Sequence, residues 1–225
     1  MSVLVIAPHA DDETLGMGGT IARFVREGRE VAVAVMTGHG EEPHPLWKPD
    51  NWDRVRGEAA RAMEVLGVKR LVFRELPAAC LTETPVHRIN KVVSELIAGL
   101  EPEELYLPFS HDLHRDHGII AYAAIVHSRA YLQGGKRIRK ISMYETPTET
   151  HLLPGQIAPS FAPNMWIDVS DTIEQKISAW GCYKSQHHGD RTPRSPEALR
   201  ALAVYRGAEI GVGAAEAFML LRMTR

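Results

Sequence analysis

Cysteine is scarce in this chain: Cys80 and Cys182 are the only two among 225 residues, and they lie far apart with no CxxC pattern. This favours two free thiols in a reducing compartment over a disulfide framework. A chain of this length buries roughly 70% of its unfolded surface on folding, so a hydrophobic core can hold it together without disulfides.

Long apolar runs and a strong excess of charge are also missing. The N-terminus has no basic segment, its apolar stretch is interrupted by Pro8 and His9, and no window approaches the ~20 apolar residues of a membrane span. The net charge is −2 and the isoelectric point about 6.6, which gives no general electrostatic reason to bind nucleic acid or an anionic membrane. We expect a cytoplasmic protein with no membrane span and no nucleic-acid partner.

Short apolar runs alternate with amphipathic segments along the first part of the chain. The uninterrupted runs are typical of strands covered on both faces, and a period of 3.6 residues is typical of helices. The predicted strands are 3–7, 31–36, 70–73 and 104–107, and the predicted helices are 16–28, 52–66, 86–100 and 117–132. This alternation predicts right-handed crossovers and a parallel sheet.

The pattern changes after Gly134 and Gly135. Later strands are predicted at 139–144, 165–169 and 217–222, helices at 171–183 and 196–207, and a Pro-rich loop lies between the first two of these strands. No repeat, low-complexity segment or convincing linker interrupts the chain. The prediction is an α/β fold, a Rossmann-like three-layer sandwich with a mostly parallel sheet, in a single domain over residues 1–225.

Two polar clusters follow predicted strands, at the edge of the sheet where ligands bind in open α/β folds. PHADDE (residues 8–13) follows the first strand, and PFSHDLHRDH (residues 108–117) follows the fourth. The clusters face each other across a crevice if these two strands are neighbours. Because the three carboxylates of PHADDE repel one another, a cation between them would account for the pattern.

A metal site can be built from both clusters. His9, Asp12 and His117 offer two imidazoles and one carboxylate and leave a coordination position open for water. That set is typical of catalytic zinc and also serves non-haem Fe(II), so the spacing does not choose between these metals. The alternatives are an acidic helix-capping turn for PHADDE and a solvated polar loop for HRDH. The position of both clusters at strand ends favours the metal site.

Four segments of the chain match a known family. VIAPHADDETLGMGGTIA closely resembles the opening signature of the PIG-L/LmbE-like N-acetylglucosaminyl deacetylases, and HRDH at 114–117 resembles their HxDH element. RGEAARAMEVLGV and RGAEIGVGAAEAF are similar to two further family segments. The four matches are in family order and span residues 3 to 218. The resemblance implies a metal-dependent hydrolase that removes an acetyl group from an amide nitrogen.

The resemblance also implies roles for individual residues. His9, Asp12 and His117 would be the metal ligands, Asp11 the general base on the attacking water, and His114 a hydrogen-bond donor to the oxyanion. Hydrolysis of an acetamide needs such groups, because both its nucleophile and its carbonyl require activation.

Asp116 and Glu13 are the other acids close to the implied ligands. Asp116, between two histidines, is expected to fix an imidazole tautomer from behind the ligands. Glu13 is expected either to orient a ligand or to begin the following helix. Gly16, Gly18 and Gly19 do not form GxGxxG, and the acidic turn would repel a pyrophosphate, so no dinucleotide cofactor is expected.

The chain departs from the family pattern at two positions. Val55 stands where the family commonly has arginine, and Arg54 and Arg56 flank it. Either arginine is expected to hold a sugar hydroxyl or phosphate, or else to lie on a solvated helix face. Arg115 stands where the family usually has proline, which is expected to change the shape or the substrate contacts of that loop.

Other residues are expected around the mouth of the site. His187 and His188 match no family ligand and are interpreted as a loop near the mouth, and Trp47 and Trp52 as rim residues. We expect residues 39–56 and 144–164 to form the pocket wall.

The leading hypothesis is a zinc-dependent deacetylase, with Fe²⁺ or another divalent metal as alternatives to Zn²⁺. Its substrate would be a small-molecule amino-sugar conjugate of the N-acetylglucosamine type, and the resemblance favours a homo-oligomer. Two alternatives stay open: metal-dependent hydrolysis of another amide or an ester, and a non-catalytic metal- or sugar-binding module. Asp11 and His114 argue against the module, because binding alone needs neither.

Overall fold

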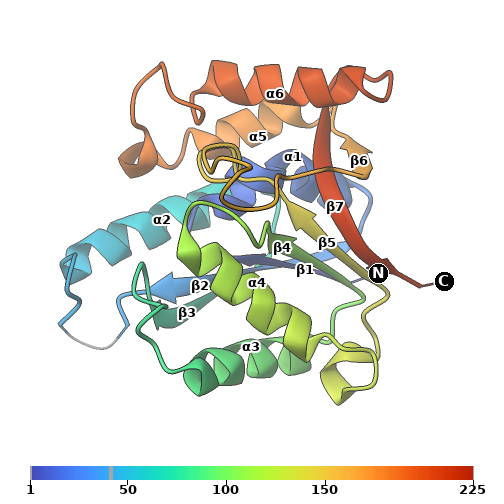
Figure 1. Cartoon of the computed structure of the whole chain (residues 1–225). Helices are drawn as coiled ribbons and strands as arrows, with labels where there is room; N and C mark the ends of the chain where they lie inside the picture. The colour runs from blue at the N-terminus through green and yellow to red at the C-terminus, as the bar shows by residue number, and fades with distance from the viewer. Residues whose placement is uncertain (1, 41–42, 225) are drawn as a thin grey trace.

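A twisted sheet with strand order β3-β2-β1-β4-β5-β7-β6 forms the centre of the computed structural model, which describes residues 2–40 and 43–224 (Figure 1). Strands β1 to β5 pair in parallel, whereas β7 is antiparallel to both β5 and β6. The strands are β1 (Ser2–Ala7), β2 (Glu30–Gly38), β3 (Arg70–Pro77), β4 (Glu104–Pro108), β5 (Lys140–Tyr144), β6 (Met165–Asp168) and β7 (Ala215–Met223).

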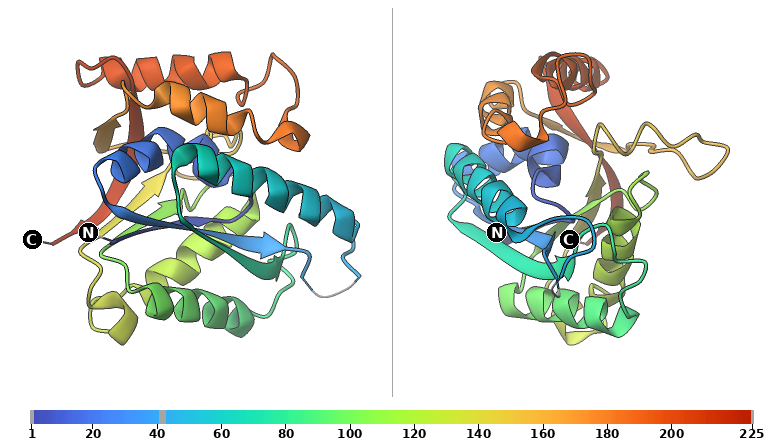
Figure 2. Two further views of the ribbon diagram at one scale, coloured as in Figure 1. Left: turned by 180° about the vertical axis from the view of Figure 1, so that it is seen from behind. Right: turned by 90° about the vertical axis from the view of Figure 1, so that its left-hand side faces the viewer.

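Helices cover both faces of the sheet. They are α1 (Asp12–Arg26), α2 (Pro49–Leu66), α3 (Val86–Leu100), α4 (Arg115–His127), α5 (Ile173–Trp180) and α6 (Pro196–Ala208), with short 3₁₀ turns at Gln133–Gly135 and Lys184–Gln186. Helices α3 and α4 lie on one face and α1, α2 and α5 on the other (Figure 2). Within the described residues no helix is long and apolar enough to cross a membrane.

Alternate side chains of the buried strands pack into two separate hydrophobic cores, one on each face of the sheet. In β1, Val3 and Val5 pack into the core beneath α1, α2 and α5, whereas Leu4 and Ile6 pack into the core beneath α3 and α4. This division explains the continuous apolar runs, because each strand needs apolar residues on both of its faces. The predicted three-layer α/β sandwich with a mostly parallel sheet is confirmed.

Each predicted strand and helix is present, but several helix starts were wrong. Helix α1 begins at Asp12 instead of residue 16, because acidic residues occupy its first turn, where they interact favourably with the helix dipole. Helix α4 begins at Arg115 instead of residue 117, and the His114 ring accepts a hydrogen bond from the backbone N–H of Asp116 as its N-cap. Helix α2 begins at Pro49 instead of residue 52, since proline suits the first helical position.

Two predictions in the last third of the chain also need correction. Helix α5 covers only Ile173–Trp180 of the predicted 171–183. Strand β7 is longer than 217–222 because it pairs along both of its edges, with β5 and with β6. This is the strand that departs from the parallel pattern.

A kink divides α1 into two parts. Met17 has non-helical backbone angles (φ −147°, ψ 27°), so a new helical turn starts after it in the sequence. The first N–H groups of that turn, on Gly19 and Thr20, donate to the Glu216 carboxylate of β7 over 3.1 and 2.6 Å. Lys176 of α5 donates to the same carboxylate over 2.6 Å. Glu216 therefore caps the second part of α1 and ties it to the sheet and to α5.

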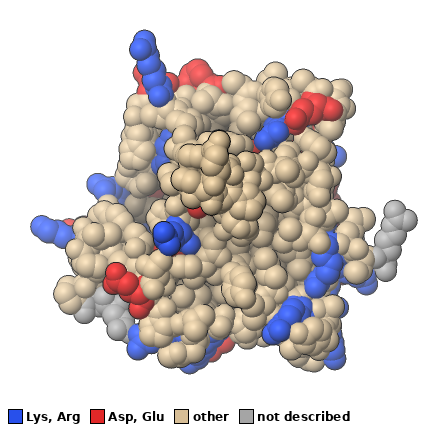
Figure 3. All heavy atoms as spheres, in the orientation of Figure 1, with Lys and Arg blue, Asp and Glu red and all other residues tan. Residues whose placement is uncertain are grey.

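Charged side chains lie mainly along the edges of the face drawn in Figure 3, with Lys and Arg beside Asp and Glu at its upper right and lower left, and Lys and Arg alone at its lower right.

Candidate metal centre and active site

Strands β1 and β4 are neighbours, with Val3 opposite Glu104 and Val5 opposite Tyr106. The two polar clusters that follow these strands therefore meet at one edge of the sheet, as predicted. Adjacent strands turn their carboxyl ends toward the same side, so the folding of the chain alone brings residues 8–13 and 108–117 together.

The three predicted ligands point at one another. The Oδ2 atom of Asp12 lies 3.3 Å from Nδ1 of His9 and 3.2 Å from Nε2 of His117. The three residues present one donor atom each within 4.8 Å of one another. The backbone N–H of His9 also donates to Asp12 over 2.9 Å, which fixes this carboxylate in place.

Each of the two imidazoles is oriented from behind by a carboxylate. Asp116 accepts a hydrogen bond from Nε2 of His9 over 3.0 Å, as expected for a residue that sets a tautomer. Asp112 accepts one from Nδ1 of His117 over 2.7 Å and is in turn held by the Thr150 hydroxyl over 2.6 Å. The lone pairs of His9 Nδ1 and His117 Nε2 are consequently directed to the same point. The sequence analysis did not predict a role for Asp112.

This donor set fits a divalent metal. Among the described residues, His117 Nε2 is buried and has no hydrogen-bond partner, which is unusual for a polar atom in a protein interior. A second grouping, of His9, His114 and Asp116, shares His9. In that grouping Asp116 Oδ2 is already engaged by the backbone N–H of Ala79 over 2.7 Å and by His9. The grouping around Asp12 is thus the better candidate.

The electrostatics of the cluster favour a positive charge at the same point. Burial lowers the pKa of His9, but Asp116 and Asp12 outweigh it and raise that pKa to about 9. The pKa of His117 is likewise raised, against the effect of burial, by Asp12 and Asp112. Burial acts to raise the pKa of Asp12, yet the two histidines hold it well below its usual value. A metal cation would interact with the same carboxylates.

Asp11 stands beside the three donors in a strained conformation. Its φ of 142° is outside the range that non-glycine residues normally adopt. Burial raises the pKa of its carboxyl to about 8, the Asp12 carboxylate adds to the rise, and Arg194 opposes it. Nη1 of Arg194 lies 3.3 Å from its Oδ2. The sequence analysis did not predict a role for Arg194.

Glu13 holds the strained backbone of Asp11. Its Oε2 accepts from the Asp11 N–H over 3.2 Å, and its Oε1 accepts from the hydroxyls of Tyr183 and Thr14 over 2.5 and 2.7 Å. Glu13 was expected either to orient a ligand or to begin the helix. The second role is closer to the structure, because Glu13 lies in the first turn of α1 and its side chain accepts from the backbone N–H of Asp11.

His114 is a neutral imidazole next to the donor set. Its ring centroid lies 4.3 Å from that of His9 and 5.6 Å from that of His117. Burial and the neighbouring His9 lower its pKa to about 4. Since its Nδ1 accepts from the backbone N–H of Asp116 over 3.2 Å, the ring proton is on Nε2. His114 can therefore donate a hydrogen bond from Nε2.

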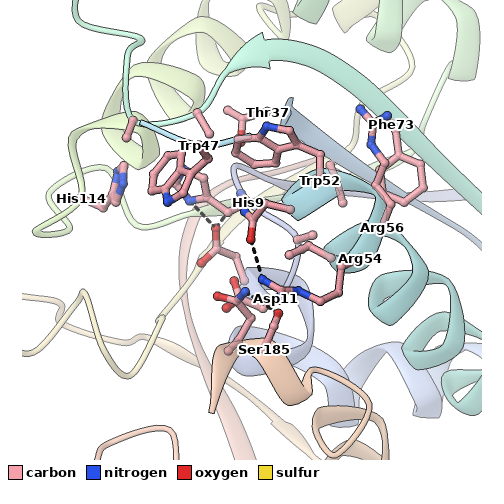
Figure 4. Close-up of a pocket in the computed structure, with 18 of the residues that line it drawn as sticks. His9, Asp11, Thr37, Trp47, Trp52, Arg54, Arg56, Phe73, His114 and Ser185 are labelled. Atoms are coloured by element: carbon pink, nitrogen blue, oxygen red, sulfur yellow. Dashed lines mark hydrogen bonds and ion pairs between the residues drawn. The ribbon is translucent and has the colours of Figure 1, made fainter. Parts of the chain in front are cut away.

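A pocket of about 420 Å³ opens in front of these groups. Arg54, Arg56, Trp47 and Trp52 all line it, on the side formed by α2 and the loop before it (Figure 4). Ser185, Gln186, His188, Arg194 and Glu149 also line it.

The pocket wall was thus only partly predicted. Within the described residues, Glu149 is the only residue of the segment 144–164 that lines the pocket. The later loop lines it instead, with Ser185, Gln186, His188 and Arg194. His188 lies at the pocket, in agreement with the prediction, whereas His187 packs on Trp180 with ring centroids 4.9 Å apart. Arg115 is exposed at the start of α4 and does not line this pocket.

The fold and the site define a Rossmann-like α/β protein with a candidate single-metal centre at the carboxyl ends of its central strands. The chain belongs to the PIG-L family, whose model, described as GlcNAc-PI de-N-acetylase, matches residues 4–128. The matched region contains every residue predicted to bind metal, to act in catalysis, to orient a ligand or to bind substrate, from His9 to His117.

The chain is similar to a deacetylase, to a hydratase and to a conserved protein whose name gives no reaction. Diacetylchitobiose deacetylase from Thermococcus kodakarensis is 27% identical over 227 residues, covering 93% of this chain and 79% of the relative. The structure of the conserved protein TT1542 from Thermus thermophilus has a TM-score of 0.77 and 27% identity, covering 99% of this chain and 96% of that one. The 4-carboxy-2-hydroxymuconate hydratase GalB from Pseudomonas putida has a TM-score of 0.76 at 20% identity, covering 100% and 98%, and shares the fold.

Proposed function

We propose that this chain is a metal-dependent deacetylase that removes the acetyl group from an N-acetylglucosamine-type sugar or glycoconjugate. The observation that carries the proposal is the convergence of His9, Asp12 and His117 on one point at the floor of a pocket, with Asp11 and His114 beside them. The family of the chain and the deacetylase from Thermococcus kodakarensis support the type of bond and substrate.

His9, Asp12 and His117 would hold the metal, for which we propose Zn²⁺. A bound divalent ion supplies a Lewis acid and lowers the pKa of water to about 7. The Asp11 carboxylate takes the proton of the attacking water and returns it to the leaving amine. His114 donates from Nε2 to the oxygen on which negative charge develops.

Acetate release tests the reaction. Metal-reconstituted protein is incubated with a panel of N-acetylated amino sugars, and we expect acetate and free amine in equal amounts. Absence of turnover on every sugar, together with turnover of another amide or an ester, would contradict the proposal. Reconstitution of the metal-free protein with Zn²⁺ or Fe²⁺ then identifies the active metal. The expected homo-oligomer and cytoplasmic location stay predictions for gel filtration and fractionation.

Asp11→Asn tests the proposed base separately from the ligands. The variant keeps the size of the side chain and the three donors, so we expect it to bind metal and to lose kcat by about 10²- to 10⁴-fold. His117→Ala is the matched comparison, in which metal content itself is lost. Full activity of Asp11→Asn would refute the assignment of the base.

A further inference from the structure

Arg194 binds one oxygen of the proposed base. Its Nη1 donates to Oδ2 of Asp11 over 3.3 Å, and within residues 2–40 and 43–224 no other side chain donates to the Asp11 carboxylate. Oδ1 of Asp11 receives no hydrogen bond from the described residues, and the side chain lines the pocket. The two oxygens are therefore unequal, because one is bound by the protein and the other is left for a ligand.

Three segments of the chain meet at the Arg194 guanidinium. Nη1 also donates to the carbonyl oxygen of Gln186 over 3.2 Å, in the same loop as Arg194, and Nη2 donates to the Thr148 hydroxyl over 3.0 Å, in the turn after β5. Asp11, which follows β1, is the third partner. Because three acceptors restrain one planar group, the guanidinium holds Nη1 at a defined place beside the base.

The pair of Arg194 and Asp11 is shielded from water. The two side chains are 12% and 8% exposed, and the guanidinium lies 5.7 Å from the centre of the Trp180 ring. Exposed ion pairs contribute little because water and salt screen them, whereas a charge-assisted hydrogen bond at low exposure is screened less. The contact is thus of the kind that keeps a carboxylate in one orientation.

The backbone of Asp11 does not by itself orient the carboxylate. Glu13 binds the Asp11 N–H and leaves the side-chain torsions χ1 and χ2 of Asp11 free. The neighbouring Asp12 carboxylate repels an ionised Asp11, and Arg194 attracts it. Without the arginine, the repulsion favours rotation of the Asp11 carboxylate away from Asp12.

We propose that Arg194 is the positioning residue of the base: it binds Oδ2 of Asp11 and holds the carboxylate so that Oδ1 faces the attacking water. The proposal rests on the proposed deacetylase function and adds a residue to it. Arg194 acts through Asp11, since in the described structure no hydrogen bond or ion pair joins it to the three predicted metal ligands. Its loss is costly because a base works only within hydrogen-bond reach of its proton, and a displacement of about 1 Å lowers a rate by about 100-fold.

Steady-state kinetics test the proposal. Acetate release from an N-acetylated amino sugar gives kcat and KM for the wild type, Arg194→Met, Arg194→Lys and Arg191→Met, whose arginine lies exposed in the same loop and does not line the pocket. We expect Arg194→Met to lower kcat by about 10- to 100-fold with little change in KM. Arg194→Lys should recover part of this loss because it keeps the charge, and Arg191→Met should match the wild type. A rise in KM with kcat unchanged would make Arg194 a substrate-binding residue and overturn the proposal.

A double-mutant cycle with Asp11→Asn separates a role through the base from a general structural role. If Arg194 acts through Asp11, Arg194→Met lowers kcat in the wild-type background and has no further effect on the residual activity of Asp11→Asn. Equal losses in both backgrounds contradict the proposal. The Kd for Zn²⁺, from competition with a chromophoric chelator, should be the same in wild type and Arg194→Met, and a weakened Kd that accounts for the loss in kcat also overturns it.

Crystal structures of the wild type and of Arg194→Met give a readout that needs no turnover. One orientation of the Asp11 carboxylate in the wild type and a turned or disordered one in the variant supports the proposal, and an unchanged carboxylate overturns it. If the protein hydrolyses no acetylated sugar, the deacetylase proposal fails, and the two structures still decide whether Arg194 positions Asp11.

Discussion

Replacing Asp112 by asparagine removes one negative charge from behind His117 and keeps the volume of the side chain. In the wild type, Asp112 accepts from Nδ1 of His117 over 2.7 Å, and both side chains are buried. The carboxylate therefore keeps the proton on Nδ1 and the lone pair on Nε2, the atom that faces Asp12.

An amide at this position cannot satisfy all its neighbours. If its oxygen faces His117, its NH₂ group meets the Thr150 hydroxyl, which donates to Asp112 in the wild type and also accepts from the Thr146 N–H over 2.7 Å. If the amide is reversed, its NH₂ group faces Nδ1 and forces the proton onto Nε2, so that His117 can no longer act as a ligand through that atom. Both arrangements weaken metal binding.

Loss of such a partner typically lowers metal affinity by about 10- to 100-fold, which corresponds to about 1.4–2.7 kcal/mol. A competition titration with a chromophoric chelator measures the Kd for Zn²⁺ of the wild type, of Asp112→Asn and of the control Asp171→Asn, which changes an exposed aspartate. Circular dichroism verifies the fold of each variant. An unchanged Kd in Asp112→Asn would show that the orientation of His117 does not depend on this carboxylate.

Two further predictions concern stability. Gly16→Ala would drive a Cβ atom into the ring of Tyr144, so we expect a loss of about 1–3 kcal/mol in the free energy of unfolding; Gly99→Ala, with no atom within 4 Å of the new Cβ, should be neutral or stabilising, and equal effects in urea denaturation would contradict the packing argument. Burial acts to raise the pKa of Glu145, but its hydrogen bonds, including the pair with Arg206, lower it below the usual 4.5, so its contribution to stability is present above pH 4.5 and is lost as the pH falls through the lowered value. The stability difference between wild type and Glu145→Gln should accordingly shrink at acid pH, and parallel curves of unfolding free energy against pH would refute this role of the carboxylate.

Strands β1, β2 and β4 were predictable because they are buried on both faces, whereas β3, at the edge of the sheet, is only half-buried. A continuous apolar run such as 3–7 is too short for a membrane span and fits a buried strand better than a helix. Helix starts were harder, since polar residues at a helix start resemble a loop in sequence. Asp12 and Arg115 both begin helices within the functional motifs, where their neighbours are chosen for chemistry.

The site residues also differ in whether the sequence could predict them. His9, Asp12 and His117 lie in short motifs directly after strands, so their meeting follows from the order of the sheet. Asp112 could have been found, because it lies five residues before His117 in the same loop. Arg194 could not have been found, because it lies in the loop between α5 and α6. No local sequence pattern in that loop indicates a residue that contacts Asp11.

The cap on the second part of α1 has a consequence for the order of folding. Glu216 lies 196 residues after Thr20, the residue whose N–H it accepts, so a ribosome-bound chain that has exposed only its first half lacks this acceptor. The helix that carries Asp12 can acquire its final hydrogen bonds only once β7 has emerged and inserted between β5 and β6. The helix that carries the candidate ligand Asp12 is thus completed by a strand far downstream in the sequence, so its second part depends on a long-range contact and not on local sequence alone.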